Sequence, residues 1–357
     1  MSDPLFEPLQ VGGISLPNRI VMAAMTRSRA DDAGNVSALT ALYYAQRAGA
    51  GLIISEGIYP EPMGKGYVRT PGLATTDHVR AWRRITDAVH RSGGRIVAQI
   101  MHVGRISDRS FLPNNAVPIA PSALRPNGQS YTDDGMVPFE TPRALDMDEI
   151  TAVVRSYGEA TQRALDAEFD GIELHAGSGY LPMQFLSSGA NVRTDRYGGS
   201  ARNRTRFIVE VLEQMIKLAG ASRIGLKITP GMTFNDALDA DPAETYATLV
   251  EQLGGLDLAF LEVVNHHEHI DFHALLRSKF NGAYLIGGGL TKATASQALL
   301  DGRADAAVFG EAFIANPDLP ERFRQGAPLA NGDRSTFYTP GPVGYVDYPT
   351  AAAIAAA

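Results

Sequence analysis

The feature that most constrains the fold of this chain is a repeated alternation of short apolar runs with longer segments of helical period. The runs are rich in Val, Ile and Leu, and each has the length of one strand. Repeated strand–helix units are typical of a parallel sheet covered by helices. Eight such units predict an α/β fold of the (β/α)₈ barrel class, because a doubly wound sheet would normally stop sooner. The expected strands are Ile20–Met25, Gly51–Ser55, Arg95–Met101, Gly171–Leu174, Ile224–Thr229, Leu258–Val264, Tyr284–Gly287 and Ala306–Phe309.

Amphipathic segments follow several of these runs and predict the helices of the barrel. No low-complexity linker interrupts the alternation, so we expect residues 1–357 to form a single barrel domain. The clearest helical segments are Ala81–His90, with Asp77 as a possible cap, Met147–Ala167, Arg202–Leu218 and Ala243–Leu253.

Two segments fall outside the repeat. Phe6–Ile20 has two glycines between two apolar triplets, which predicts a hairpin that covers the bottom of the barrel. Residues 103–146 follow the third strand and are rich in Pro, Gly, Ser and Asn. An excursion of this length in a compact domain is usually a lid or a binding loop. We therefore expect 103–146 to form a lid over the top of the barrel.

Composition excludes several classes of partner and chemistry. The formal net charge is −7 and the basic residues are interspersed with acidic ones, which argues against a nucleic-acid partner. With 0 cysteines there is no thiolate metal site, and the chain suits a reducing cytosol. The consecutive histidines of His266-His267-Glu268-His269 converge poorly on one ion, so no metal is expected. Without a signal-like or membrane-spanning run, the protein is expected to be soluble and cytoplasmic.

Candidate catalytic groups lie where strand Gly171–Leu174 ends. His175 could donate a hydrogen bond to an oxyanion, and Tyr180 could give up a proton. The same two residues could equally be a core histidine and a packed tyrosine. Glycines also follow the seventh and eighth strands, at Gly288, Gly289 and Gly310. At that position in a barrel they favour a phosphorylated ligand, because backbone N–H groups can approach the oxygens closely.

Specific strings of residues are spread over nearly the whole chain. They include Phe6-Glu7-Pro8-Leu9, Met25-Thr26-Arg27, Ser55-Glu56-Gly57, His102-Val103-Gly104-Arg105, Gly179-Tyr180-Leu181, Arg193-Thr194-Asp195-Arg196-Tyr197-Gly198-Gly199-Ser200, Ala315-Asn316-Pro317-Asp318-Leu319 and Gly344-Tyr345-Val346-Asp347-Tyr348-Pro349. Together these strings resemble the old yellow enzyme family of flavin-dependent ene-reductases.

The resemblance implies a non-covalent FMN at the mouth of the barrel. A nicotinamide nucleotide, NADPH or NADH, would reduce the flavin, and the C=C bond of an α,β-unsaturated carbonyl compound would reoxidise it. By resemblance, the substrate carbonyl would bind His175 and Ser178, and Tyr180 would protonate the substrate. Met101 and Tyr338 would line the substrate pocket. The flavin would contact Thr26, Gly57, Gln99, Lys227, Gly288, Gly289, Gly310 and position 311.

Four positions depart from the family pattern. Ser178 stands where the family has Asn or His, Lys227 where it has Arg, and Met101 where it usually has Trp. Glu311 stands where an arginine pairs with the FMN phosphate, which predicts weakened FMN binding. The alternative to an ene-reductase is therefore a divergent member without tight FMN, acting as a flavin-free isomerase or cyclase or as a small-molecule binding protein. The chain could be a monomer or a homo-oligomer.

Overall fold

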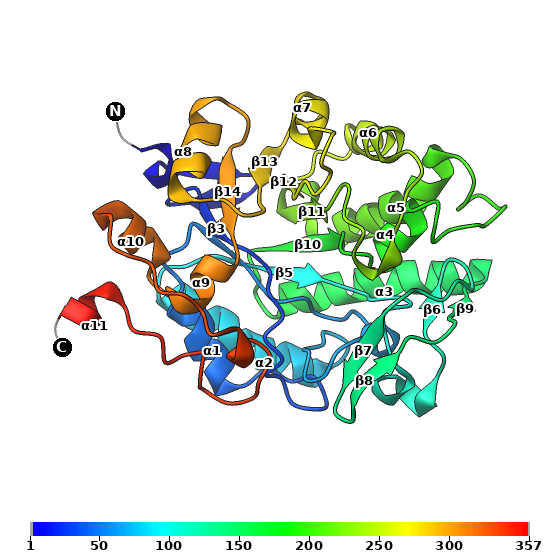
Figure 1. Ribbon diagram of the computed structural model, residues 1–357, viewed down its shortest axis with the longest axis horizontal. Coiled ribbons are helices and arrows are strands. Elements are labelled where there is room, and N and C mark those ends of the chain that lie inside the picture. The colour runs from blue at the N-terminus through cyan, green and yellow to red at the C-terminus, as the bar shows by residue number, and fades with distance from the viewer. Residues whose placement is uncertain (1–2, 356–357) are drawn as a thin grey trace.

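Eight parallel strands form a closed barrel in the computed structural model, which describes residues 3–355 (Figure 1). Each strand pairs with the next one along the chain, and the last pairs with the first, with Ala307 opposite Ile20. The predicted barrel is confirmed, although most strands are slightly shorter than expected. The strands are β3 (Ile20–Met22), β4 (Leu52–Ile54), β5 (Ile96–Ile100), β10 (Gly171–Ala176), β11 (Ile224–Ile228), β12 (Phe260–Val263), β13 (Ala283–Ile286) and β14 (Ala306–Phe309).

The helices surround the barrel, and most of the longer ones begin at polar caps. In α3, the Asp146 side chain accepts from the N–H of Glu149 at 2.8 Å, and the Glu149 side chain accepts in return from the N–H of Asp146 at 2.9 Å. The α-helices are α1 (Ala38–Ala45), α2 (Thr76–Arg91), α3 (Met147–Asp166), α4 (Leu181–Leu186), α5 (Ala201–Ala219), α6 (Pro242–Leu253), α7 (Phe272–Leu276), α8 (Lys292–Leu300), α9 (Glu311–Ala315), α10 (Leu319–Gln325) and α11 (Ala351–Ala355). The 3₁₀ turns are η1 (Pro4–Phe6), η2 (Pro62–Gly64), η3 (Arg109–Phe111), η4 (Pro113–Asn115), η5 (Ala221–Arg223), η6 (Phe234–Asp236), η7 (Arg277–Lys279) and η8 (Arg334–Thr336).

Helix α2 begins earlier than the sequence pattern indicated. Thr75 has an extended backbone, and its hydroxyl accepts from the N–H of His78 at 3.2 Å. Thr75 is therefore the N-cap, and Asp77 lies in the first turn. The expected cap at Asp77 was wrong because the extended backbone that a cap needs falls at Thr75 and Asp77 is already helical.

The N-terminal hairpin covers the bottom of the barrel, as predicted. Strands β1 (Leu9–Val11) and β2 (Ile14–Leu16) pair antiparallel, and their apolar side chains join a core cluster with residues from the barrel interior. Gly12 has a φ of +53°, and a Cβ there would lie 2.3 Å from the carbonyl oxygen of Ser222. Only glycine lets the hairpin approach the η5 turn this closely.

The excursion after β5 forms its own small structure beside the mouth of the barrel. It contains the parallel pair β6 (Ile119–Ala120) and β9 (Arg143–Ala144), and the hairpin β7 (Gln129–Thr132) and β8 (Gly135–Pro138). Asp133, in the turn of that hairpin, accepts a hydrogen bond from Arg69 at 2.9 Å. The tip of the excursion is thereby tied to the loop that follows β4.

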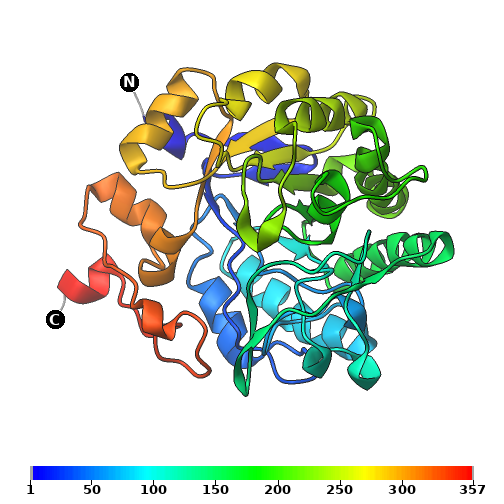
Figure 2. The ribbon, with the colours of Figure 1, turned by 45° about the vertical axis from the view of Figure 1, so that its right-hand side comes forward.

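The segment after α10 returns to the barrel mouth and packs beside α1 (Figures 1 and 2). The buried guanidinium of Arg27 donates to the carbonyls of Phe337 at 3.1 Å and Gly344 at 2.8 Å. The ring of Tyr345 stacks on Tyr43 of α1 with a centroid distance of 4.2 Å. These contacts fix the backbone of a stretch that is far in sequence from the strands it touches.

Candidate active site

A cavity of about 610 Å³ opens at the carboxyl ends of the barrel strands. Parallel strands in a barrel deliver their functional side chains at this end. The cavity brings together most of the residues that the sequence singled out. They are Thr26, Gly57, Gln99, Met101, His175, Ser178, Tyr180, Lys227, Gly310, Glu311 and Tyr338.

The two glycines predicted after the seventh strand lie elsewhere. Gly288 has a φ of +99° and lines a separate hollow with Asn265 and Arg303. Gly289 has a φ of +65° and has no atom within 4 Å of a Cβ built on it. Both backbones therefore need glycine, but the structure does not bring these residues to the central cavity. Their role in phosphate binding stays a prediction.

His175 presents a hydrogen-bond donor to the cavity. Its Nδ1 accepts from the N–H of Gly177 at 3.2 Å, so the neutral ring carries its proton on Nε2. Burial, with the nearby charge of Lys227, holds the pKa of His175 well below its usual value. The imidazole is neutral at physiological pH, and it can donate one hydrogen bond to a ligand oxygen without carrying a charge.

Tyr180 lies beside His175 and keeps its phenolic proton. The two rings meet edge to face with a centroid distance of 5.2 Å. Burial raises the pKa of Tyr180 well above its usual value, and the neighbouring Tyr67 adds to the rise. The Tyr67 and Tyr180 hydroxyls are 2.9 Å apart. A protonated phenol held in this way can donate its proton to a substrate atom inside the cavity.

Ser178 is held in a left-handed backbone conformation, with a φ of +55°. Its N–H donates to the Thr229 hydroxyl at 2.9 Å, and its carbonyl accepts from the Asn235 amide at 2.8 Å. These bonds fix the backbone and leave the short hydroxyl at the cavity wall. A serine here offers one donor, on a shorter side chain than an asparagine would provide.

Lys227 is part of a buried charge cluster at the bottom of the cavity. Its Nζ lies 2.6 Å from Oε1 of Glu262, and Gln99 donates to Glu173 at 2.6 Å. Burial opposes the charge on Lys227, but Glu262 and Glu173 outweigh it and raise the pKa of the lysine. Burial, with the charge of Glu262, raises the pKa of Glu173. Glu262 is therefore the direct ion-pair partner of the lysine.

Glu56 follows β4 and carries a buried carboxyl, next in sequence to Gly57 of the cavity wall. Its Oε2 accepts from the N–H of Arg27 at 3.3 Å, and burial raises its pKa from 4.5 to about 7. Because the folded state holds this proton more tightly than the unfolded chain, stability falls as the pH rises from 4.5 to about 7. The full loss is about 3 kcal/mol.

We expect Glu56→Gln to remove this pH dependence. As the pH is raised from about 5 to about 8, the free energy of unfolding of the variant should increase relative to that of the parent protein. Urea unfolding of both proteins at each pH measures the effect, and Glu268→Gln, an exposed surface change, serves as the control. An equal difference between parent and variant at the two pH values would contradict the assignment.

Small residues leave room for a flat ring along one wall of the cavity. Ala23, Ala24 and Gly310 line this wall. At Gly57, a Cβ would lie 2.6 Å from the sulfur of Met101, so glycine is needed for the methionine to pack there. Thr26, Gln99 and Lys227 supply polar groups at the same cavity, so the residues present fit a flavin.

A second hollow of about 500 Å³ lies outside the first and shares Thr26, Tyr180 and Tyr338 with it. Tyr131, from hairpin β7–β8, and Phe234, from η6, also line this outer hollow. The predicted excursion therefore reaches the approach to Tyr180. The outer hollow provides space for a substrate next to the residues that could protonate it.

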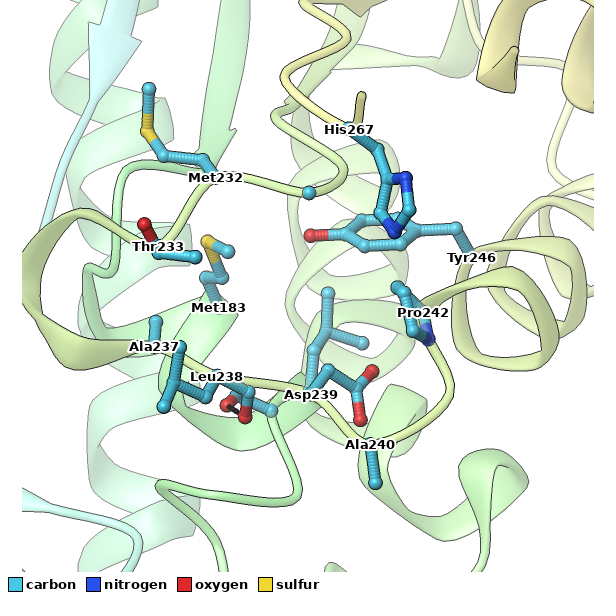
Figure 3. A pocket seen from close by; sticks show the side chains of 13 residues that line it. Met183, Met232, Thr233, Ala237, Leu238, Asp239, Ala240, Pro242, Tyr246 and His267 are labelled. Atoms are coloured by element: carbon cyan, nitrogen blue, oxygen red, sulfur yellow. Dashed lines mark hydrogen bonds between the residues drawn. The ribbon is translucent and has the colours of Figure 1, made fainter. Parts of the chain in front are cut away.

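A smaller hollow of about 270 Å³ lies beside α4 and is lined by Met183, Met232 and Tyr246, whose hydroxyl points into it (Figure 3). His267 also lines it, and its Nδ1 accepts from the N–H groups of His269 and Ile270. Because this ring nitrogen closes a turn, the histidine run has a local structural role. None of the predicted site residues lines this hollow, so the central cavity is the candidate active site.

The relationship to known proteins is decided by a match along most of the chain. A sequence model of the NADH:flavin oxidoreductase / NADH oxidase family matches residues 4–330. The chain belongs to this family. The resemblance to old yellow enzymes is confirmed, and the protein is an FMN-dependent oxidoreductase of the ene-reductase type that uses a nicotinamide nucleotide. The flavin-free alternative is not supported.

Relatives in the family cover nearly the full length of the chain. 12-Oxophytodienoate reductase 1 of Oryza sativa subsp. japonica is 41% identical over 359 residues, which cover 97% of this chain and 93% of that protein. The probable flavin mononucleotide-dependent alkene reductase of Leishmania infantum is 39% identical, with 97% of each chain covered. The structure of morphinone reductase in complex with tetrahydroNAD is 44% identical, has a TM-score of 0.94 and covers 97% of each chain.

Several groups in this family member could not be assigned from the sequence. Glu262 and Glu173 interrupt apolar strands, and a charge inside a buried strand was a signal that could have marked them. Tyr67 and Arg334 carry no such signal, because only the fold brings them to the cavity.

No helix within residues 3–355 has both the length and the apolar character needed to cross a bilayer.

Proposed function

We propose that His175 and Tyr180 carry out the substrate chemistry of this ene-reductase. The observation that supports this most directly is that the Nε2–H of His175 and the hydroxyl of Tyr180 belong to touching rings at one cavity. When bound, FMN supplies the hydride that it has received from a nicotinamide nucleotide. His175 holds the carbonyl oxygen of an α,β-unsaturated compound and stabilises the negative charge that develops there. Tyr180 donates its proton to the carbon next to the carbonyl.

The proposed cofactor contacts follow from the placement of the cavity residues. Thr26 and Gln99 present side-chain hydrogen-bonding groups, and Gly57 offers its backbone at the cavity beside Met101. Lys227 contributes positive charge that Glu262 partly neutralises. Met101 and Tyr338 shape the substrate side. We propose the 103–146 excursion as a lid, since its Tyr131 lines the outer hollow.

His175→Ala tests the carbonyl-binding role. Removing one donor of this kind costs about 10²–10³-fold in turnover, because the oxyanion loses its stabilisation. We expect a loss of this size in enone reduction, with flavin reduction by the nicotinamide nucleotide unchanged. Stopped-flow absorbance of the flavin separates the two steps, and His273→Ala, far from the cavity, is the control. Full retention of enone reduction in His175→Ala would contradict the role.

We also propose the domain organisation, partners and location of the enzyme. We infer one barrel domain over residues 1–357, a small-molecule substrate and no nucleic-acid partner, in line with the net charge of −7. A cytoplasmic location suits a chain with 0 cysteines. Monomeric and homo-oligomeric forms are both compatible with this function.

A further inference from the structure

Glu311 leaves the cofactor phosphate without the arginine that the family pattern places at this position. Among the residues described along the central cavity, the cations are Lys227 and Arg334. Lys227 lies within the barrel, 2.6 Å from Glu262. Arg334 lies at the mouth, where its Nη2 donates to Oε2 of Glu311 at 3.1 Å. A cation is therefore present beside Glu311, but it comes from a different part of the chain.

The backbone around Arg334 is firmly placed. It begins the short turn η8, in which the Asp333 side chain accepts from the N–H of Ser335 at 3.0 Å. The carbonyl of Thr336, the last residue of η8, accepts a hydrogen bond from the buried Arg29 at 2.9 Å. The side chain is much freer, with 78% of its surface exposed. Arg334 can thus change partner without any movement of the chain that carries it.

The contact between Arg334 and Glu311 is weak enough to exchange. Both side chains are exposed, at 78% and 54%, and exposed ion pairs gain little because water screens them. A phosphate monoester carries more charge than a carboxylate and offers three acceptor oxygens. The planar guanidinium can engage two of those oxygens at once. A phosphate at the mouth would therefore compete with Glu311 for Arg334.

We propose that Arg334 is the phosphate-binding cation of this chain and that it leaves Glu311 to pair with the phosphate of FMN. The proposal rests on the FMN-dependent function. Glu311 remains close to the phosphate and its negative charge lowers the affinity for FMN. The exchange therefore predicts that the protein prefers FMN to a flavin without phosphate, but binds FMN less tightly than it would without Glu311. The phosphates of a nicotinamide nucleotide share this chemistry, so binding must be measured with the flavin alone.

Titration of the full-length apoprotein with FMN and with riboflavin tests the proposal. Riboflavin has the same ring system and lacks the phosphate. We expect the parent protein to prefer FMN. Arg334→Gln should weaken FMN binding by about 10- to 100-fold, the loss expected for one charge-assisted hydrogen bond. Its riboflavin affinity should not change, which also shows that the variant is folded. Glu311→Gln should tighten FMN binding alone.

A matched control is available in α10. Arg324 is also exposed and donates to Glu321 at 2.8 Å, away from the cavity. Arg324→Gln should leave both affinities unchanged. An unaltered ratio of FMN to riboflavin affinity in Arg334→Gln, with FMN still bound, overturns the role of Arg334 alone. Failure of the parent protein to bind either flavin overturns the FMN-dependent function and this proposal with it.

Discussion

Replacing Tyr180 with phenylalanine should slow enone reduction by about 10²–10⁴-fold, the contribution typical of a positioned general acid. The reason is that burial keeps the phenol protonated beside His175, and phenylalanine has no proton to give. Flavin reduction by the nicotinamide nucleotide needs no acid from this residue, so its rate should hardly change. Stopped-flow measurement of the flavin absorbance follows each half-reaction separately.

Two further tyrosine variants control this experiment. Tyr197→Phe removes a hydroxyl that donates to Glu210 at 2.7 Å and lines neither hollow, so it should leave both half-reactions intact. Tyr67→Phe removes the hydroxyl that lies 2.9 Å from Tyr180 and should slow enone reduction less than Tyr180→Phe does. Equal losses in both half-reactions of Tyr180→Phe would contradict its assignment as the acid.

Lys227→Met should destabilise the folded apoprotein by about 3–5 kcal/mol. The variant removes the cation from a site where Glu262 and Glu173 are fully buried, and an uncompensated buried carboxylate is costly. Glu173 already has a raised pKa because burial and the charge of Glu262 oppose its ionisation. Urea unfolding of the apoprotein measures the loss without any contribution from bound flavin.

The charge explanation predicts how two companion variants behave. Lys227→Arg keeps the positive charge and should retain most of the stability. The double variant Lys227→Met, Glu262→Gln removes one carboxylate together with the lysine and should recover part of the loss. If Lys227→Met costs no more than about 1 kcal/mol, as an exposed ion pair would, the cluster does not have the proposed role.

Local sequence patterns were sufficient for the barrel and for much of the site. Strands β10 and β11 are mostly apolar, with Glu173, His175 and Lys227 as the exceptions, and every residue in them is buried, as is typical of strands covered on both faces. His175 lies near the end of β10 and Tyr180 follows shortly after it, so this strand places both residues at the mouth of the barrel. The start of α2 was missed because Thr75, which is its cap, lies outside the apolar pattern.

Partnerships across the fold could not be predicted in the same way. By resemblance Lys227 was expected to contact the flavin, and the structure shows that Glu262 on the next strand also pairs with its charge. Glu311 was expected to repel a phosphate, but Arg334 lies beside it, 23 residues later in the chain. In both cases the effect of a charge depends on a partner that only the tertiary structure supplies.

The claim that this protein is a nicotinamide-dependent ene-reductase is tested most directly with the FMN-loaded wild-type protein in the absence of oxygen. The protein is first mixed with NADPH or NADH and then with cyclohexenone, while the flavin absorbance is followed and the product is analysed. We predict that the nucleotide bleaches the flavin and that the enone restores it, with one saturated ketone formed per flavin reoxidised. A flavin that the nucleotide does not bleach, or one that regains its colour without formation of the saturated ketone, would contradict the claim.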